Sequence, residues 1–129
     1  MATAHSVLLL DIDRQHRLRA EEIIAALGYE PVGFANGKQA LNAFRTEPNR
    51  FDLIIIDNDL ADLAPMQLAA AIVGMAPGRP ILLCARSGVE LNINALSKVG
   101  IDEVIRKPLY IRDVADALSR SINRISQAD

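Results

Sequence analysis

The stretch that decides the fold class is Phe51-Asp52-Leu53-Ile54-Ile55-Ile56-Asp57. Its four consecutive aliphatic residues are typical of a strand buried on both faces of a parallel sheet. The run Val7-Leu8-Leu9-Leu10 shows the same pattern and ends just as abruptly, at Asp11. The carboxyl ends of parallel strands gather at one edge of a sheet, where ligand crevices form. We therefore expect Asp11 and Asp57 to lie in one pocket.

Strand and helix patterns alternate along the rest of the chain. The expected strands are Ser6–Leu10, Glu30–Phe34, Leu53–Ile56, one opening at Pro80, and Val104–Ile105. The expected helices are Arg14–Leu27, one from the N-cap Asn36 to Glu47, one marked by Leu68, Ile72 and Met75, one with its apolar stripe from Val89 to Val99, and Ile111–Ile125. This alternation predicts an α/β fold, (βα)5, with a doubly wound parallel sheet of five strands and helices on both faces.

Length and composition favour one cytoplasmic domain, spanning residues 1–129 with a core of about 5–126. The net charge of −2 gives no general attraction to nucleic acid or to acidic membranes. No apolar run approaches the roughly 18–20 residues that span a bilayer, and the N-terminus lacks a secretion signal. The single cysteine, Cys84, lies inside an apolar run and is expected to be a small buried side chain.

Three ionisable residues fall at the ends of the first, third and fifth expected strands: Asp11, Asp57 and Lys107. For any one of them alone, a turn or helix-cap role is the simpler interpretation. Together they predict a small charged pocket that is able to hold a metal ion. An ammonium within about 4–6 Å of a carboxylate favours the charged form of both groups.

Taken with Gly28-Tyr29-Glu30, Pro80-Ile81-Leu82-Leu83-Cys84, Gly100-Ile101-Asp102 and Lys107-Pro108-Leu109, these segments give the chain a specific resemblance. Over nearly its whole length it resembles the response-regulator receiver domains of bacterial two-component signalling. That resemblance implies the flavodoxin-like version of the expected fold. It also implies a signalling module rather than an enzyme, and a cis peptide bond before Pro108.

The resemblance further implies roles for individual residues. Asp57 is expected to be the phosphoacceptor, taking a phosphoryl group from a histidine kinase or phosphotransfer protein. Asp11, Asp57 and the backbone carbonyl of Asp59 are expected to hold Mg²⁺. Lys107 is expected to contact the phosphoryl group and the acceptor carboxylate. A carboxylate nucleophile, a hard cation and a fixed ammonium are the groups that phosphoryl transfer requires.

Two positions depart from the family pattern. Ile12 stands where the family carries a second acid that ligates the metal, so Mg²⁺ is expected to bind weakly unless Asp13 replaces that ligand. Ala85 stands at the switch position, where the family places Ser or Thr. A lost hydrogen bond to a charged group costs about 1.5–3 kcal/mol. The expected protein is therefore an atypical receiver with a weakened switch.

Two other functions stay open. The first is a pseudo-receiver, a binding module that recognises its partner without phosphorylation, which Ile12 and Ala85 favour. The second is a phosphatase: residues 8–13 resemble the nucleophile motif of haloacid-dehalogenase-like enzymes, in which Asp11 would attack and Asp13 would act as general acid. Arg14 argues against it, because that family prefers Gly or Thr at this position.

The expected surfaces are less informative. Four residues of the last helix, Arg112, Asp116, Arg120 and Arg124, recur every four residues, which fits either a solvated face or a homodimer through the last two helices. Arg14, Arg17 and Arg19 give the first helix a basic edge that we expect to be plain surface. His5 and His16 lack partners at metal-binding spacing. No DNA-binding motif follows the last helix, so no nucleic-acid partner is expected for this chain.

Overall fold

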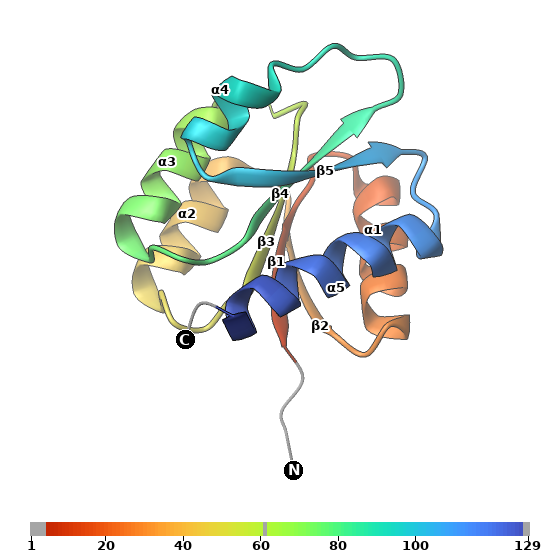
Figure 1. Ribbon diagram of the computed structural model, residues 1–129, viewed down its shortest axis with the longest axis horizontal. Helices are drawn as coiled ribbons and strands as arrows, with labels where there is room; N and C mark the ends of the chain where they lie inside the picture. The colour runs from red at the N-terminus through yellow and green to blue at the C-terminus, as the bar shows by residue number, and fades with distance from the viewer. Residues whose placement is uncertain (1–4, 61, 128–129) are drawn as a thin grey trace.

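A sheet between two layers of helices organises the computed structural model, which describes residues 5–60 and 62–127 (Figure 1). Within these residues, the sheet contains five strands, all parallel, in the order β2-β1-β3-β4-β5. They are β1 (Ser6–Leu10), β2 (Glu30–Phe34), β3 (Leu53–Asp57), β4 (Ile81–Arg86) and β5 (Ile101–Lys107). The order reverses at β1, so the structure confirms the doubly wound flavodoxin-like fold.

The helices are α1 (Arg14–Ala26), α2 (Gly37–Thr46), α3 (Pro65–Met75), α4 (Ile93–Lys98) and α5 (Ile111–Gln127). Helices α1 and α5 cover one face of the sheet, and α2, α3 and α4 cover the other (Figure 1). The Asn36 side chain caps α2 as predicted and accepts a hydrogen bond from the amide of Gln39. Asn92, which was not predicted as a cap, accepts one from the amide of Ala95 at the start of α4.

Two elements, α4 and β5, differ most from the sequence-based expectation. Helix α4 begins at Ile93, so the prediction that its helical stripe starts at Val89 was wrong. The Val89 amide instead hydrogen-bonds to the carbonyl of Arg86, after Gly88 has turned the chain with a φ of 85°. Strand β5 spans seven residues rather than two. It lies at an edge of the sheet, where exposed polar residues interrupt the apolar run.

The pleat of the sheet decides which strand residues reach the pocket. Leu9, Ile55 and Ile105 pack in the core that α1 and α5 cover. Side chains of a strand point to the same face every second residue. Two residues after each of these lie Asp11, Asp57 and Lys107, at or just beyond the ends of the same three strands. The three ionisable side chains therefore follow directly from three buried apolar ones and leave the sheet on one face.

We expect Ile54→Ala to destabilise the protein by about 2–5 kcal/mol, because Ile54 is fully buried in central strand β3 and its truncation leaves a cavity. Denaturant unfolding measures this loss. The matched control is Ile93→Ala, since Ile93 is 59% exposed. Its effect should stay within about 0.5 kcal/mol. Equal effects of the two variants would contradict the assignment of Ile54 to the core.

Candidate functional site

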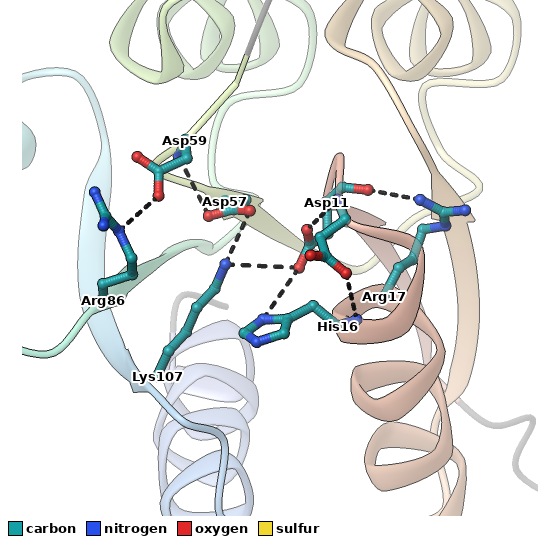
Figure 2. Close-up of polar contacts among 8 residues, drawn as sticks. Asp11, His16, Arg17, Asp57, Asp59, Arg86 and Lys107 are labelled. Carbon is teal, nitrogen blue, oxygen red and sulfur yellow. Dashed lines mark hydrogen bonds and ion pairs between the residues drawn. The ribbon is translucent and has the colours of Figure 1, made fainter.

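Lys107 joins the ends of three strands at the carboxyl edge of the sheet (Figure 2). Its ammonium nitrogen lies 3.0 Å from Oδ2 of Asp57 and 3.8 Å from Oδ2 of Asp11. Asp11 directly follows β1, Asp57 ends β3, and Lys107 ends β5. All three residues are buried, with no more than 8% of any of them exposed. The structure thus brings together the residues that sequence reasoning selected.

Backbone amides hold the two carboxylates in place. The amide of Asp13 donates to Oδ1 of Asp11 at 2.9 Å, and the amide of Asp59 donates to Oδ1 of Asp57 at 3.2 Å. Both contacts are local turns in which an aspartate side chain bonds to the backbone two residues on. Each carboxylate therefore has one oxygen oriented by its own turn and the other facing Lys107.

Two arginines of α1 donate hydrogen bonds to backbone carbonyls next to the site. Arg17 donates to the backbone carbonyl of Asp11 at 2.8 Å, and Arg19 donates to the carbonyl of Leu109 at 3.2 Å. The expectation that the basic edge of α1 is plain surface was therefore incomplete, because these two residues fix backbone on either side of the pocket. Sequence reasoning missed them, since a contact between Arg19 and Leu109 leaves no local pattern.

The site carries more negative than positive charge. Burial and the neighbouring Asp57 together raise the pKa of Asp11 to about 6, against the opposing effects of the Asp13 amide and of Lys107. Burial alone would lower the pKa of Lys107, but the hydrogen bond to Asp57 and the charge of Asp11 outweigh it, so that pKa lies above its usual value. One ammonium thus faces two buried carboxylates, and Asp11 resists ionisation.

A cavity of about 480 Å³ opens over Asp57 and Lys107. Ile12, Asp13, His16 and Arg86 also line it. Lys107 is followed by a cis peptide bond to Pro108, as the resemblance implies. Asp57 and Lys107 are the buried residues of this lining, so they lie at the base of the cavity.

One of the two departures from the family pattern, Ile12, lines this cavity, and the other, Ala85, directly precedes the cavity residue Arg86. Ile12 is 47% exposed at the rim of the cavity, where an apolar side chain contributes no metal ligand. Asp13 caps α1, and its carboxylate accepts a hydrogen bond from the amide of His16 at 3.0 Å. That bond lowers the pKa of Asp13. Ala85 is fully buried and carries no hydroxyl.

Sequence reasoning missed two residues that line the cavity. The Nδ1 atom of His16, a partly exposed residue of α1, lies 4.0 Å from Oδ2 of Asp11. Arg86 donates from Nε to Oδ2 of Asp59 at 3.0 Å. No motif marked either residue, because each becomes relevant only when the strands are assembled.

Cys84 is buried beneath the site, and burial raises the pKa of its thiol to about 12. This confirms the expectation of a small buried side chain and leaves the thiol without nucleophilic character at neutral pH.

Within residues 5–60 and 62–127, His, Cys, Asp and Glu form no cluster of three or more that is arranged to hold a metal. In the same part of the chain, every helix is too short or too polar to cross a membrane.

Comparison with known proteins identifies the family. The family model for the response regulator receiver domain matches residues 7–119. The chain is 27% identical over 124 residues to the transcriptional regulatory protein ZraR of Escherichia coli, covering 95% of this chain and 27% of that protein. It is 28% identical to the sensor histidine kinase GacS of Pseudomonas protegens, covering 89% of this chain and 13% of that protein. It thus spans well under half the length of these relatives.

A relative of similar size is the chemotaxis protein CheY of Bacillus subtilis, which is 23% identical and covers 93% of this chain and 99% of that protein. Among solved structures, a receiver domain protein of Clostridium thermocellum superposes with a TM-score of 0.89 at 22% identity, covering 97% of this chain and 99% of that one. The superposition supports the fold, and the family model covers most of the chain. The chain therefore belongs to the family of response regulator receiver domains.

Proposed function

We propose that Asp57 accepts a phosphoryl group from a histidine kinase or a phosphotransfer protein, and that the chain passes the signal on by protein–protein contacts. Receiver domains in general are signalling modules that interact with such donors. The observation that carries the proposal is the 3.0 Å contact between Lys107 and Asp57 at the base of an open cavity. A buried carboxylate beside a buried ammonium is poised both to attack phosphorus and to have the product neutralised.

In the proposed step, a carboxylate oxygen of Asp57 attacks the phosphorus of phosphohistidine. A phosphorus–oxygen bond forms while the phosphorus–nitrogen bond breaks, and the imidazole leaves with a proton taken from solvent. The amide of Asp59 holds Oδ1 of Asp57 throughout. Lys107 can follow the developing charge from Oδ2 of the carboxylate to a phosphoryl oxygen, because its stem is flexible and its head is a point charge.

Receiver domains generally use Mg²⁺ at the phosphorylation site, and the residues here fit a weakly held ion. Asp11, Asp57 and the backbone carbonyl of Asp59 would hold it, since hard oxygen ligands are those that Mg²⁺ prefers. When bound, the ion would neutralise phosphoryl oxygens. The excess negative charge of the site favours a cation, whereas Ile12 supplies no ligand and Asp13 is engaged in capping α1.

The two alternative functions, a phosphatase and a pseudo-receiver, have less support. The phosphatase proposal needs Asp13 as general acid, but a carboxyl whose pKa is lowered by a helix cap holds its proton poorly. The pseudo-receiver draws support from Ile12 and Ala85, and phosphorylation itself separates it from the main proposal.

A homodimer through α4 and α5 also stays a proposal. Arg120 and Arg124 each contact Glu103 of the same chain, at 2.9 and 3.0 Å, so both already have a partner within the chain.

We expect Asp57→Asn to abolish phosphorylation by acetyl phosphate in the presence of Mg²⁺, because the amide is not a nucleophile. Intact mass spectrometry should show one added phosphoryl group on the wild type and none on this variant. Asp102→Asn, at an exposed aspartate outside the pocket, should gain the group as the wild type does. A wild type that gains no phosphoryl group at high donor concentration would favour the pseudo-receiver.

We expect Ile12→Asp to tighten Mg²⁺ binding at least about tenfold, because it adds a carboxylate at the rim of the cavity. Isothermal titration calorimetry of the wild type and the variant measures the two dissociation constants. Ile12→Asn serves as the control of matched size without the charge. If both variants bind Mg²⁺ no more tightly than the wild type, position 12 lies outside the metal site.

We expect stability without divalent ions to fall as pH rises from about 4 to 7. The folded pKa of Asp11 is raised from 3.8 to about 6, so in this window the folded state holds a proton that the unfolded state has released. The expected loss is about 1–3 kcal/mol. Urea unfolding in EDTA at several pH values measures it, and Asp11→Asn should remove this component. An unchanged pH profile in that variant would contradict the shift.

A further inference from the structure

We propose that Arg86 is a second cationic ligand for the phosphoryl group on Asp57, and that it binds this group by leaving Asp59. The inference rests on the proposed phosphorylation of Asp57 and adds a residue to that site. Arg86 directly follows Ala85, the position that lacks the hydroxyl. A positive side chain one residue further along β4 would thus replace a neutral donor that the chain has lost.

The sheet places Arg86 beside the reacting residues. Cys84 pairs in register with Asp57 on β3, and Arg86 pairs with Lys107 on β5. Cys84 belongs to the core under α1 and α5, and Arg86, two residues later, leaves the strand on the same face. This is the face from which Asp57 and Lys107 also emerge. Arg86 accordingly lines the same cavity as they do.

The present partner of Arg86 holds it loosely. Nε of Arg86 lies 3.0 Å from Oδ2 of Asp59, and the two side chains are 67% and 48% exposed (Figure 2). An ion pair this open to water is screened and contributes little to stability. Separating it therefore costs little. Arg86 is held at the mouth of the cavity, and a stronger anion there can capture it.

A phosphoryl group on Asp57 is such an anion. Phosphorylation replaces one negative charge by up to two and adds three acceptor oxygens. A guanidinium can bind a phosphoryl group through two parallel hydrogen bonds, whereas it makes a single hydrogen bond to the Asp59 carboxylate. Lys107 is already shared between Asp57 and Asp11. The added charge thus exceeds what Lys107 alone neutralises.

The backbone of Arg86 is anchored, so only its side chain needs to move. Arg106 donates to the carbonyls of Arg86 and Val89 at 3.0 and 2.7 Å. The Ser87 amide donates to the carbonyl of Lys107 at 3.2 Å. These contacts tie the loop after β4 to β5. The guanidinium can exchange partners by rotating about its own side-chain bonds while the loop stays in place.

The test follows phosphorylation by acetyl phosphate with Mg²⁺ present, using intact mass, for the full chain and its variants. We expect Arg86→Ala to react about tenfold more slowly than the wild type, which corresponds to the loss of one charged hydrogen bond. Arg86→Lys keeps the charge but not the paired hydrogen bonds, so its rate should lie between the two. The matched control is Arg50→Ala, because Arg50 is an exposed arginine in an ion pair with Glu47, away from the cavity.

A double-mutant cycle tests the exchange of partners. Asp59→Asn keeps the backbone groups of residue 59 but releases Arg86, so we expect it to speed phosphorylation. The gain should be at least about threefold larger when Arg86 is present than in the Arg86→Ala background. An equal gain in both backgrounds would show that Asp59 acts by its own charge, and the exchange of partners would be wrong.

The outcomes separate the two proposals. If the wild type gains no phosphoryl group, the proposed function fails and this inference fails with it. If the wild type reacts and both Arg86 variants react as fast as the wild type, the proposed phosphorylation stands but Arg86 is not a ligand of the phosphoryl group. Faster reaction of Arg86→Ala would mean that Arg86 shields the cavity instead. As a readout independent of rate, nitrogen NMR should show the Arg86 Nε signal shifting on phosphorylation and the Arg50 signal unchanged; an unmoved Arg86 signal would also overturn the inference.

Discussion

The contact on which the site depends is the ion pair between Lys107 and Asp57, 3.0 Å long and almost fully buried. The same ammonium faces Asp11 at 3.8 Å, so one positive charge serves two carboxylates. Buried charges are costly unless they are paired, and here the pairing is incomplete by one unit. Burial, together with the neighbouring Asp57, accordingly raises the pKa of Asp11. A pocket with one positive charge too few favours the binding of a cation. Under the proposed function, that cation and Lys107 would together neutralise the phosphoryl group.

The residues around that ion pair differ from the family pattern in two ways: there are fewer metal ligands, and there is an additional positive side chain. At the proposed metal site, Ile12 brings no ligand and Asp13 is occupied as a helix cap. On the proposed phosphoryl side, Ala85 brings no hydroxyl, but the next residue is an exposed arginine whose backbone carbonyl accepts a hydrogen bond from Arg106. Under the two proposals, the protein relies less on a tightly bound ion and more on its own cations to balance the phosphoryl group.

The sequence predicts most of the fold and the centre of the site. Short aliphatic runs that end at Asp11 and Asp57 locate buried strands and their carboxyl ends, because both features are local in the chain. The length of β5 was not predictable in this way, since an edge strand alternates polar and apolar residues. The start of α4 depends on the Asn92 cap and on the turn at Gly88. The contacts of Arg17 and Arg86 required the assembled sheet, because their partners come from other turns and strands.

The most direct test of a pocket with excess negative charge compares Asp57→Asn with Lys107→Met, measured as free energy of unfolding in EDTA at neutral pH. Replacing Asp57 leaves one carboxylate for one ammonium, so the account predicts a more stable protein. Replacing Lys107 leaves two buried carboxylates with no partner, so it predicts a loss on the order of 3 kcal/mol. Changes of the same sign, or no change in either variant, would contradict the account.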